Sequence, residues 1–305
     1  MPIPEVEKIW MDGELVDWDK AQVHLLSHSL HYGSGVFEGI RAYETPKGAA
    51  VFRLTDHINR LFRSASIYRM EIPIPPEELV EATKVVIRAN GLKSCYIRPI
   101  VMRGYGEMGL DPTKAPVNVA VAVWPWGTYL GEEGIKHGVR AKVSSFRRND
   151  ANIIPTAAKA TGQYLNSILA KIEVTEAGYD EAVLLNIHGH VADGAGENIF
   201  VVKNACLYTP PTSSGALEGI TRDSVMHIAE DFEVPSKERD LVRTDLYLAD
   251  EAFFTGTAAE IAPIREVDNR FIGEPGPITR KLQEKFFEVV SGKDKDYDHW
   301  LEYVD

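Results

Sequence analysis

The pattern of apolar residues divides the chain into two parts, which meet at a polar, glycine-punctuated stretch between Pro125 and Gly138. Before this stretch, strand-like segments are mixed with two helix-like segments, an arrangement typical of α+β domains. The chain has 305 residues, more than one hydrophobic core usually supports. We therefore expect a small α+β domain over residues 1–126, a linker over 127–136 and a larger mixed α/β domain over 137–305.

Local signals predict the individual elements of both parts. Residues 9–11 and 14–16 flank Asp12-Gly13, a dipeptide typical of a two-residue hairpin turn. Thr55 and Asp56 are candidate caps for a first helix, and Pro75 begins a second helix that runs to about Asn90. The remaining apolar patterns predict strands at 51–54, 94–102, 117–124, 139–144, 182–185 and 198–202, and helices at 162–177, 221–231 and 277–290.

Composition narrows the classes of partner. The formal net charge is -12, and a field of this sign repels phosphate backbones, so a general nucleic-acid partner is not expected. The first eight residues hold no apolar signal core, and no apolar stretch is long enough to span a bilayer. Cys95 and Cys206 form no CxxC pair and are interpreted as reduced thiols. We expect a cytoplasmic protein without membrane contact.

Residues 104–109 match the pattern G-x-G-x-x-G and follow a predicted strand. A dinucleotide site would need a helix to begin there, with its N-terminus facing the pyrophosphate. The following Leu110-Asp111-Pro112 breaks the chain instead. We interpret the segment as a glycine-rich turn.

Three histidines, His24, His28 and His31, have the spacing i, i+4, i+7. On a helix they would share one face, as metal ligands can. Ser27 and Ser29 weaken such a helix, and no acidic residue falls among the three. We therefore favour hydrogen-bonded or core histidines, and we expect no metal site.

A single lysine, Lys159, lies within a run of small and apolar residues over 153–162. Desolvation in such a run would lower the pKa of its amine and make it a nucleophile toward an aldehyde. Small neighbours would also let a flat ring approach. Composition alone does not separate this interpretation from an ordinary solvated lysine.

Six segments together resemble bacterial branched-chain aminotransferases, which are class IV aminotransferases of pyridoxal-phosphate fold type IV. They follow one another in the family order and cover nearly the whole chain. The resemblance implies the fold of that family, similar to D-amino-acid aminotransferases, with a small α+β domain and a larger α/β-barrel-like domain. The segments are HYGSGVFEGIRAY at 31–43, YIRP at 96–99, PTAAK at 155–159, GAGENIF at 194–200, GITR at 219–222 and GTAAEI at 256–261.

The resemblance implies an activity. A member of this family transfers the amino group of L-leucine, L-isoleucine or L-valine to 2-oxoglutarate by a ping-pong mechanism, giving branched-chain 2-oxo acids and L-glutamate. This is a step of branched-chain amino acid biosynthesis. D-amino-acid aminotransferases and aminodeoxychorismate lyases of the same fold type are the nearest alternatives. An R-selective amine transaminase is another relative, and a catalytically silent cofactor carrier is a remote alternative. The family also implies a homodimer or a homohexamer, with sites where domains and subunits meet.

The resemblance assigns cofactor contacts to particular residues. Lys159 would hold pyridoxal 5′-phosphate as an internal aldimine and then move the proton between the substrate Cα and the cofactor. Glu197 would lie against the pyridine nitrogen and keep the ring protonated, because a protonated ring is the better electron sink. Tyr164 would donate a hydrogen bond to the ring O3′ oxygen. The phosphate contacts implied by the family are Arg60, the helix-terminal amides of Ile220 and Thr221, and Thr257.

The resemblance also implies a substrate pocket. Large apolar surfaces suit the side chains of leucine, isoleucine and valine. For the α-carboxylate, the family candidates are Tyr96, Arg98 and the amides of Thr257 and Ala258; the role of Arg41, in the pocket or in a structural ion pair, stays open. The second carboxylate of glutamate needs a donor from Tyr32, Tyr129 or Arg98. The full set of implied substrate contacts is Tyr32, Phe37, Gly39, Arg41, Tyr96, Arg98, Met108, Tyr129, Thr257, Ala258 and Ala259.

Overall fold

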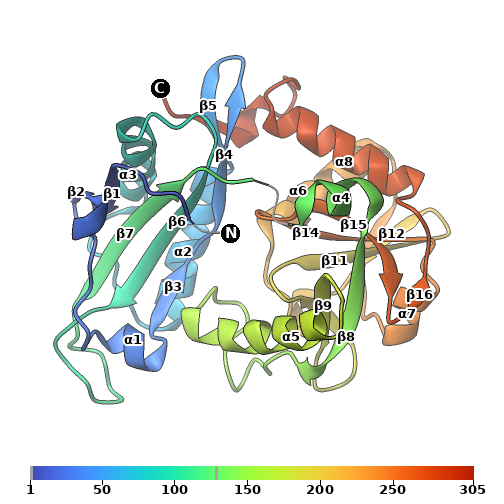
Figure 1. Cartoon of the computed structure of the whole chain (residues 1–305), viewed down its shortest axis with the longest axis horizontal. Coiled ribbons are helices and arrows are strands. Elements are labelled where there is room, and N and C mark those ends of the chain that lie inside the picture. Colours follow the sequence, from blue (N-terminus) through green and yellow to red (C-terminus); the bar gives the residue numbers. More distant parts are fainter. Residues whose placement is uncertain (1–2, 128–129) are drawn as a thin grey trace. The chain divides into compact units, whose positions relative to one another are not determined.

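The computed structural model of the chain describes residues 3–127 and 130–305 (Figure 1). Contacts between residues divide the chain into two compact units. The first unit contains residues 1–127, 158–162 and 288–305, and the second contains 128–157 and 163–287. Tyr129, one of the expected substrate contacts, lies outside the described residues.

The first unit is built on an antiparallel sheet with the strand order β17-β5-β4-β6-β7-β1-β2, and β3 pairs with β6. The predicted hairpin is confirmed: β1 pairs with β2, and Asp12 and Gly13 have the positive φ angles of 48° and 101° that a tight hairpin turn requires. The C-terminal strand β17 pairs with β5, which the sequence patterns do not predict. The strands are β1 (Lys8–Met11), β2 (Glu14–Asp17), β3 (Gly35–Phe37), β4 (Ile40–Thr45), β5 (Gly48–Phe52), β6 (Cys95–Arg103), β7 (Val117–Trp124) and β17 (Leu301–Tyr303).

Two long helices, α2 (Leu54–Ile67) and α3 (Pro76–Ala89), cover this sheet. Ile58, Leu61 and Ala65 of α2 are buried at helical spacing, and fully burying an isoleucine or leucine side chain contributes roughly 1.5–3 kcal/mol. Shorter helical turns are η1 (Trp18–Lys20), α1 (His28–Tyr32) and η4 (Asp298–Trp300).

The predicted caps of α2 are wrong. The helix begins at Leu54, and its N-cap residue is Arg53, with a left-handed φ of 50°. Thr55 lies inside the first turn, where its backbone N–H donates to the carboxylate of Glu302 at 2.6 Å. A carboxylate from the far end of the chain therefore satisfies an amide that a local rule assigns to a neighbouring side chain.

The segment that we interpret as a linker contains a short helix, α4 (Gly131–His137), which its glycine content did not predict. Lys136 and His137 lie in its last turn, where positive charge favours a helix C-terminus. Gly138 ends the helix with a φ of 83°, and a Cβ atom there would lie 3.1 Å from the Arg265 backbone nitrogen, so glycine suits this position on both counts.

The second unit contains a mixed sheet with the strand order β10-β9-β8-β15-β14-β11-β12-β13, and β16 pairs with β15. Strand β8 is parallel to both β9 and β15, and parallel neighbours need long connections. Sequence patterns predict β8, β9 and β11 but not β14 and β15. The strands are β8 (Val139–Arg147), β9 (Glu181–Leu185), β10 (Val191–Gly194), β11 (Asn198–Lys203), β12 (Cys206–Thr209), β13 (Ser236–Glu238), β14 (Glu251–Gly256), β15 (Glu260–Val267) and β16 (Arg270–Phe271).

Helix α5 (Tyr164–Glu176) supplies the crossover between β8 and β9, close to its predicted range. Helix α6 (Ile220–Asp231) also forms as predicted. Helix α8 (Pro277–Val290) has its predicted bounds, and its last residues, from Glu288, belong to the first unit. The remaining turns are η2 (Thr161–Gln163), η3 (Thr212–Ser214) and α7 (Arg243–Tyr247). None of the helices in residues 3–127 and 130–305 combines the length and apolarity that crossing a membrane requires.

Candidate active site

The segment that carries Lys159 is fixed by backbone hydrogen bonds within the first unit. The Phe37 N–H donates to the Lys159 carbonyl oxygen at 3.0 Å, and the Lys159 N–H donates to Ser64 Oγ at 3.1 Å. Val36 and Ala160 form an isolated antiparallel bridge beside it. The Lys159 side chain is half-buried, with Nζ 5.2 Å from the centre of the Phe37 ring. Contacts on both sides therefore hold the backbone from which this amine projects.

Arg60, the expected phosphate contact, lies in a buried cluster with Glu38 and His57. Arg60 donates from Nε to Glu38 Oε1 at 2.7 Å and from Nη2 to Oε2 at 2.8 Å. His57 Nδ1 lies 2.8 Å from the same Oε2. Burial alone would raise the pKa of Glu38, but the charge and hydrogen bonds of Arg60 outweigh it and hold this pKa well below its usual range.

Gly39, Tyr96 and Arg98 lie together at one part of the first sheet. A Cβ atom at Gly39 would fall 2.1 Å from the Tyr96 hydroxyl, so only glycine allows this tyrosine to pack over the backbone there. The Arg98 guanidinium lies over the rings of Phe37 and Tyr96, at 4.7 and 5.3 Å from their centres. Arg41 pairs with Tyr96 across β4 and β6, and its buried guanidinium lies 5.1 Å from the centre of the Tyr43 ring.

Tyr32 and Met108 are exposed, with 50% and 37% of their surfaces accessible. His28 holds their segments together, because its Nδ1 lies 2.7 Å from Ser34 Oγ and its Nε2 lies 2.9 Å from the Gly109 carbonyl oxygen. His31 likewise hydrogen-bonds the Leu25 carbonyl. These histidines therefore have hydrogen-bonding roles.

Two further sequence motifs have a structural description. In the described part of the chain, no group of three or more His, Cys, Asp or Glu side chains is arranged to hold a metal ion. The segment over 104–109 forms no helix, and a Cβ atom at Gly104 would fall 2.0 Å from Asn118 Oδ1. It is a turn, as predicted.

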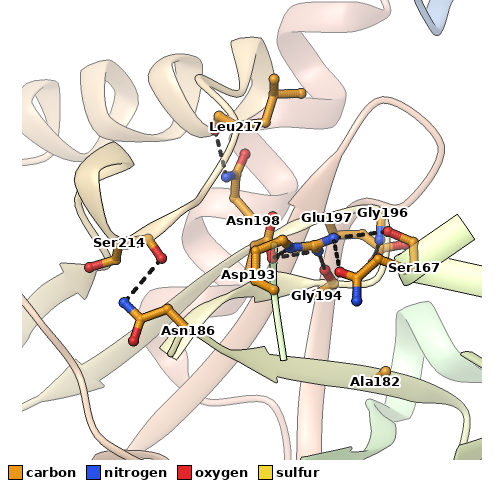
Figure 2. A network of polar contacts seen from close by, with 12 residues as sticks. Ser167, Ala182, Asn186, Asp193, Gly194, Gly196, Glu197, Asn198, Ser214 and Leu217 are labelled. Atoms are coloured by element: carbon orange, nitrogen blue, oxygen red, sulfur yellow. Dashed lines mark hydrogen bonds and ion pairs between the residues drawn. The ribbon is translucent and has the colours of Figure 1, made fainter. Parts of the chain in front are cut away.

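In the second unit, Glu197 lies buried in the turn between β10 and β11 (Figure 2). The Gly196 N–H donates to Glu197 Oε2 at 3.0 Å, and the Gly194 N–H donates to the Glu197 carbonyl oxygen at 2.7 Å. Burial, reinforced by the negative charge of Glu181, raises the pKa of Glu197 to about 8. This carboxyl group therefore holds its proton more tightly than an ordinary glutamate does.

A buried ion pair supports the turn that carries Glu197. Arg148 donates from Nε and Nη2 to Asp193 Oδ1 at 2.8 and 2.6 Å, and from Nη2 to the Gly194 carbonyl at 2.6 Å. Its Nη1 donates to Ser167 Oγ of α5 at 3.0 Å. Figure 2 shows Ser167, Asp193, Gly194 and Glu197 gathered around these contacts. The network connects the turn to the helix that begins at Tyr164, whose side chain is half-buried.

Ile220 and Thr221 form the buried first turn of α6. The N-cap residue is Gly219, which has no side chain to accept hydrogen bonds from the first amides. A Cβ atom at Gly219 would fall 1.8 Å from Asn198 Oδ1, and Asn198 Nδ2 donates to the Leu217 carbonyl at 2.9 Å. Asn198 thus positions the start of a helix whose N-terminal amides are suited to an anion.

Thr257, Ala258 and Ala259 form the turn between β14 and β15, closed by the pairing of Gly256 with Glu260. The first two are half-buried and Ala259 is buried. The turn presents successive backbone amides at the end of two central strands of the sheet, an arrangement that can bind a phosphate or a carboxylate.

Each unit carries groups that suit pyridoxal phosphate. In the first unit, an amine suits its aldehyde and an arginine suits its phosphate; in the second, a buried carboxyl group suits its ring nitrogen and helix-terminal amides suit its phosphate.

Comparison with known proteins gives the family. Residues 35–267 match the family model described as amino-transferase class IV. The chain belongs to this family. Among the relatives of this class IV aminotransferase, the branched-chain-amino-acid aminotransferase of Pseudomonas aeruginosa is 49% identical over 298 residues, which cover 97% of each chain. That of Escherichia coli K12 is 46% identical over 307 aligned positions, covering 100% of this chain and 99% of the relative.

Solved structures agree with this family membership. The crystal structure of the Escherichia coli branched-chain amino acid aminotransferase superimposes with a TM-score of 0.97 at 46% identity, covering 99% of this chain and 100% of that one. The branched-chain amino acid aminotransferase from Thermobaculum terrenum, solved in its PLP form, has a TM-score of 0.92 at 37% identity, with 99% of each chain covered. The class IV aminotransferase described here therefore has fold type IV, as predicted.

Sequence reasoning missed the polar residues that support this site. Glu38 lies within the segment over 31–43, and His57 lies three residues before Arg60 on α2. The sequence motifs assign no role to either residue. In the second unit, sequence reasoning also missed the Arg148–Asp193 ion pair and Glu181. The only available signal was the spacing of His57, Arg60 and Ser64, which places three polar residues on one face of an otherwise apolar-faced helix.

Proposed function

We propose that this class IV aminotransferase transfers the amino group of L-leucine, L-isoleucine and L-valine to 2-oxoglutarate, with pyridoxal 5′-phosphate as cofactor. Full-length identity of 46–49% to branched-chain aminotransferases supports this activity. The structural observation that carries it is the buried carboxyl group of Glu197, which accepts a hydrogen bond from the Gly196 N–H at 3.0 Å. When bound, pyridoxal phosphate supplies an electron sink for the charge that develops at the substrate Cα.

Lys159 is proposed as the residue that binds the aldehyde and moves the proton. Its Nζ would take a proton from the substrate Cα and return one to the C4′ carbon of the cofactor. The hydrogen bonds of its backbone to Phe37 and Ser64 support this role, because they limit where the amine can lie.

Glu197 and Tyr164 are proposed to set the protonation of the ring. Glu197 would hold a proton at the ring nitrogen, for which a carboxyl group with a pKa raised to about 8 is well suited. The amide of Gly196 and the turn held by Arg148 fix the position of this carboxyl group. Tyr164, at the start of α5, would donate to the ring oxygen.

The phosphate is proposed to bind Arg60, the amides of Ile220 and Thr221, and Thr257. A fork-shaped guanidinium and the amides of a helix N-terminus are the donors that phosphate prefers. The absence of a side-chain cap at Gly219 supports the assignment to α6.

For the substrate, the close packing of Phe37, Gly39, Tyr96 and Arg98 supports their proposed grouping as wall and carboxylate donors. Apolar ring surface would hold a branched side chain, and Arg98 would help to compensate the second carboxylate of glutamate. The other proposed contacts are Arg41, Thr257, Ala258 and Ala259, and Tyr129 outside the described residues.

We also propose domains over 1–126 and 137–305 joined by residues 127–136, and a location in the cytoplasm, which the two free cysteines support. The proposed assembly is a homodimer or a homohexamer, in which Tyr32 and Met108 would lie in an interface between subunits. An apolar stripe on α5 supports this assembly, because exposed stripes of this kind usually mark interfaces. The stripe consists of Leu165, Ile168, Leu169 and Ile172, which are between 47% and 65% exposed.

The assembly is tested by its mass. We expect sedimentation velocity to give at least twice the 33.9 kDa of one chain, and we expect Ile168→Lys in this stripe to lower the mass to that of the monomer, because a buried unpaired charge is costly. A native chain that sediments as a monomer would contradict the proposal.

The substrate class is tested by the amino-donor spectrum. With 2-oxoglutarate as acceptor, we expect turnover of L-leucine, L-isoleucine and L-valine to exceed that of D-alanine and of (R)-1-phenylethylamine by roughly 100-fold, which needs only about 2.7 kcal/mol of discrimination. Faster turnover of D-alanine or of the amine would assign the chain to another branch of the same fold. No turnover of any donor would favour a silent cofactor carrier.

A further inference from the structure

The cluster of Glu38, His57 and Arg60 has no role in the functions proposed above beyond the contact of Arg60 with phosphate. Glu38 is completely buried, and its two carboxylate oxygens accept four hydrogen bonds: two from Arg60, one from His57 and one from the Gly39 N–H at 3.3 Å. A carboxylate so placed cannot turn without losing several of these bonds at once. Glu38 therefore fixes the positions of the groups that donate hydrogen bonds to it.

The geometry of the Arg60 contact is restrictive. Nε and Nη2 lie on one edge of the guanidinium, and each donates to a different oxygen of Glu38, so the plane of the group is fixed by two parallel bonds. His57, three residues earlier on α2, holds the second oxygen and closes the arrangement. The orientation of the remaining edge of Arg60 is therefore determined by Glu38 and His57.

The charges of the cluster argue against a purely stabilising purpose. The carboxylate of Glu38 stays ionised, and burial lowers the pKa of His57, so His57 is neutral near pH 7. The cluster is then one buried ion pair with a neutral donor. Burying such a pair contributes little to stability, because the cost of desolvating two charges offsets their attraction. The better reason for burying this ion pair is that it fixes the position of the Arg60 guanidinium.

The same face of α2 also reaches the segment that carries the catalytic lysine. Ser64, one helical turn after Arg60, accepts the hydrogen bond of the Lys159 N–H, and the residue before Glu38 donates to the Lys159 carbonyl. Glu38 therefore connects α2 to the strand end against which the Lys159 backbone lies.

We propose that Glu38 and His57 are positioning residues, which orient the Arg60 guanidinium so that it receives the phosphate group of the cofactor. This inference rests on the phosphate contact proposed for Arg60. It predicts that the cluster matters for ligands that carry a phosphate and not for the same ring without one.

The test compares pyridoxal phosphate with pyridoxal, each in equilibrium dialysis against the cofactor-free full-length protein. For Glu38→Gln, we expect the Kd of pyridoxal phosphate to rise roughly ten-fold, similar to the loss when a metal-binding residue is deprived of its hydrogen-bond partner, with the Kd of pyridoxal unchanged. The amide keeps the shape of the side chain but sets an NH2 group against a donor of Arg60. The matched control is Glu266→Gln: Glu266 accepts from Nε and Nη2 of Arg140 in the second unit, and neither Kd should change.

If Glu38→Gln does not fold, variants of His57 test whether the cluster positions Arg60 for the phosphate. An asparagine can donate from its amide where His57 donates from Nδ1, whereas a leucine cannot. We expect His57→Leu to weaken pyridoxal phosphate roughly five-fold and His57→Asn to restore affinity to within about two-fold of the native value. A purely structural cluster would lower the melting temperature in these variants and leave both Kd values unchanged.

Three results would overturn the inference: an unchanged Kd for pyridoxal phosphate, an equal weakening of both ligands, or tighter binding of pyridoxal phosphate because a negative charge was removed. Failure of the proposed function is recognised separately with Arg60→Met. If that variant binds pyridoxal phosphate as the native protein does, the phosphate contact itself is wrong. If it loses affinity and the Glu38 and His57 variants do not, only the positioning role fails.

Discussion

Replacing Lys159 with alanine is expected to reduce kcat/KM for L-leucine by roughly 10⁴-fold or more, because the variant loses the amine that we propose binds the aldehyde and moves the proton. The fold should survive, since the segment is held by backbone hydrogen bonds to Phe37 and Ser64 that alanine keeps. Steady-state assays with 2-oxoglutarate measure the loss, and circular dichroism checks the fold.

A matched lysine separates this effect from a general loss of positive charge. Lys203, at the end of β11, pairs with Asp250 at 2.8 Å and is 44% exposed, so its pair contributes at most about 1 kcal/mol. Lys203→Ala should therefore retain native kcat/KM. If Lys159→Ala kept more than about a tenth of native activity, the catalytic role of this residue would be refuted.

Replacing Glu197 with glutamine is expected to lower kcat by roughly 10²–10³-fold, the usual effect of removing one preorganised electrostatic contact. An amide cannot hold an exchangeable proton for the ring nitrogen as the carboxyl group can. Glu197→Asp keeps the carboxyl group and should retain more activity than the glutamine variant. Near-native kcat in the glutamine variant, which keeps the shape of the side chain, would contradict a role of this carboxyl group in holding the proton.

The same residue makes a second, independent prediction about the cofactor-free protein. Below the ordinary pKa of 4.5, Glu197 is protonated in the folded and unfolded states alike, and its burial carries no ionisation penalty. Between 4.5 and about 8 the unfolded chain releases this proton while the folded chain keeps it, so the free energy of unfolding falls as the pH rises. Glu197→Gln removes this trend.

Urea unfolding at about pH 5 and about pH 9 measures the difference. We expect the glutamine variant to gain stability relative to the native protein across this range, by at most roughly 5 kcal/mol, which is the full shift converted at 1.36 kcal/mol per pKa unit. A stability difference that stays constant with pH would show that Glu197 has an ordinary pKa in the folded protein.

Elements with strong local signals were predictable from sequence. The β1–β2 hairpin follows from Asp12-Gly13, and α8 follows from Pro277 and an apolar helical repeat. The start of α2 was not predictable, because Glu302, far away in sequence, binds its first-turn amide at Thr55. Helix α4 was missed because glycines normally oppose helix formation.

The candidate site likewise contains residues that sequence motifs indicate and residues that only the fold reveals. Lys159, Glu197 and Arg60 receive their proposed roles only because whole motifs resemble a family; read singly, each has an ordinary surface interpretation. Glu38 and His57 could not have been found in this way, since their importance comes from a buried contact between the end of β3 and α2. The raised pKa of Glu197 depends on burial and on the charge of Glu181, which only the fold brings near.

The most direct test of the account is to find the lysine that binds the cofactor. Borohydride reduction of the protein loaded with pyridoxal phosphate, followed by digestion and mass spectrometry, should place the label on the peptide that contains Lys159 and on no peptide of Lys159→Ala. A label on another lysine, or no label at all on the native protein, would contradict the assignment on which the proposed mechanism rests.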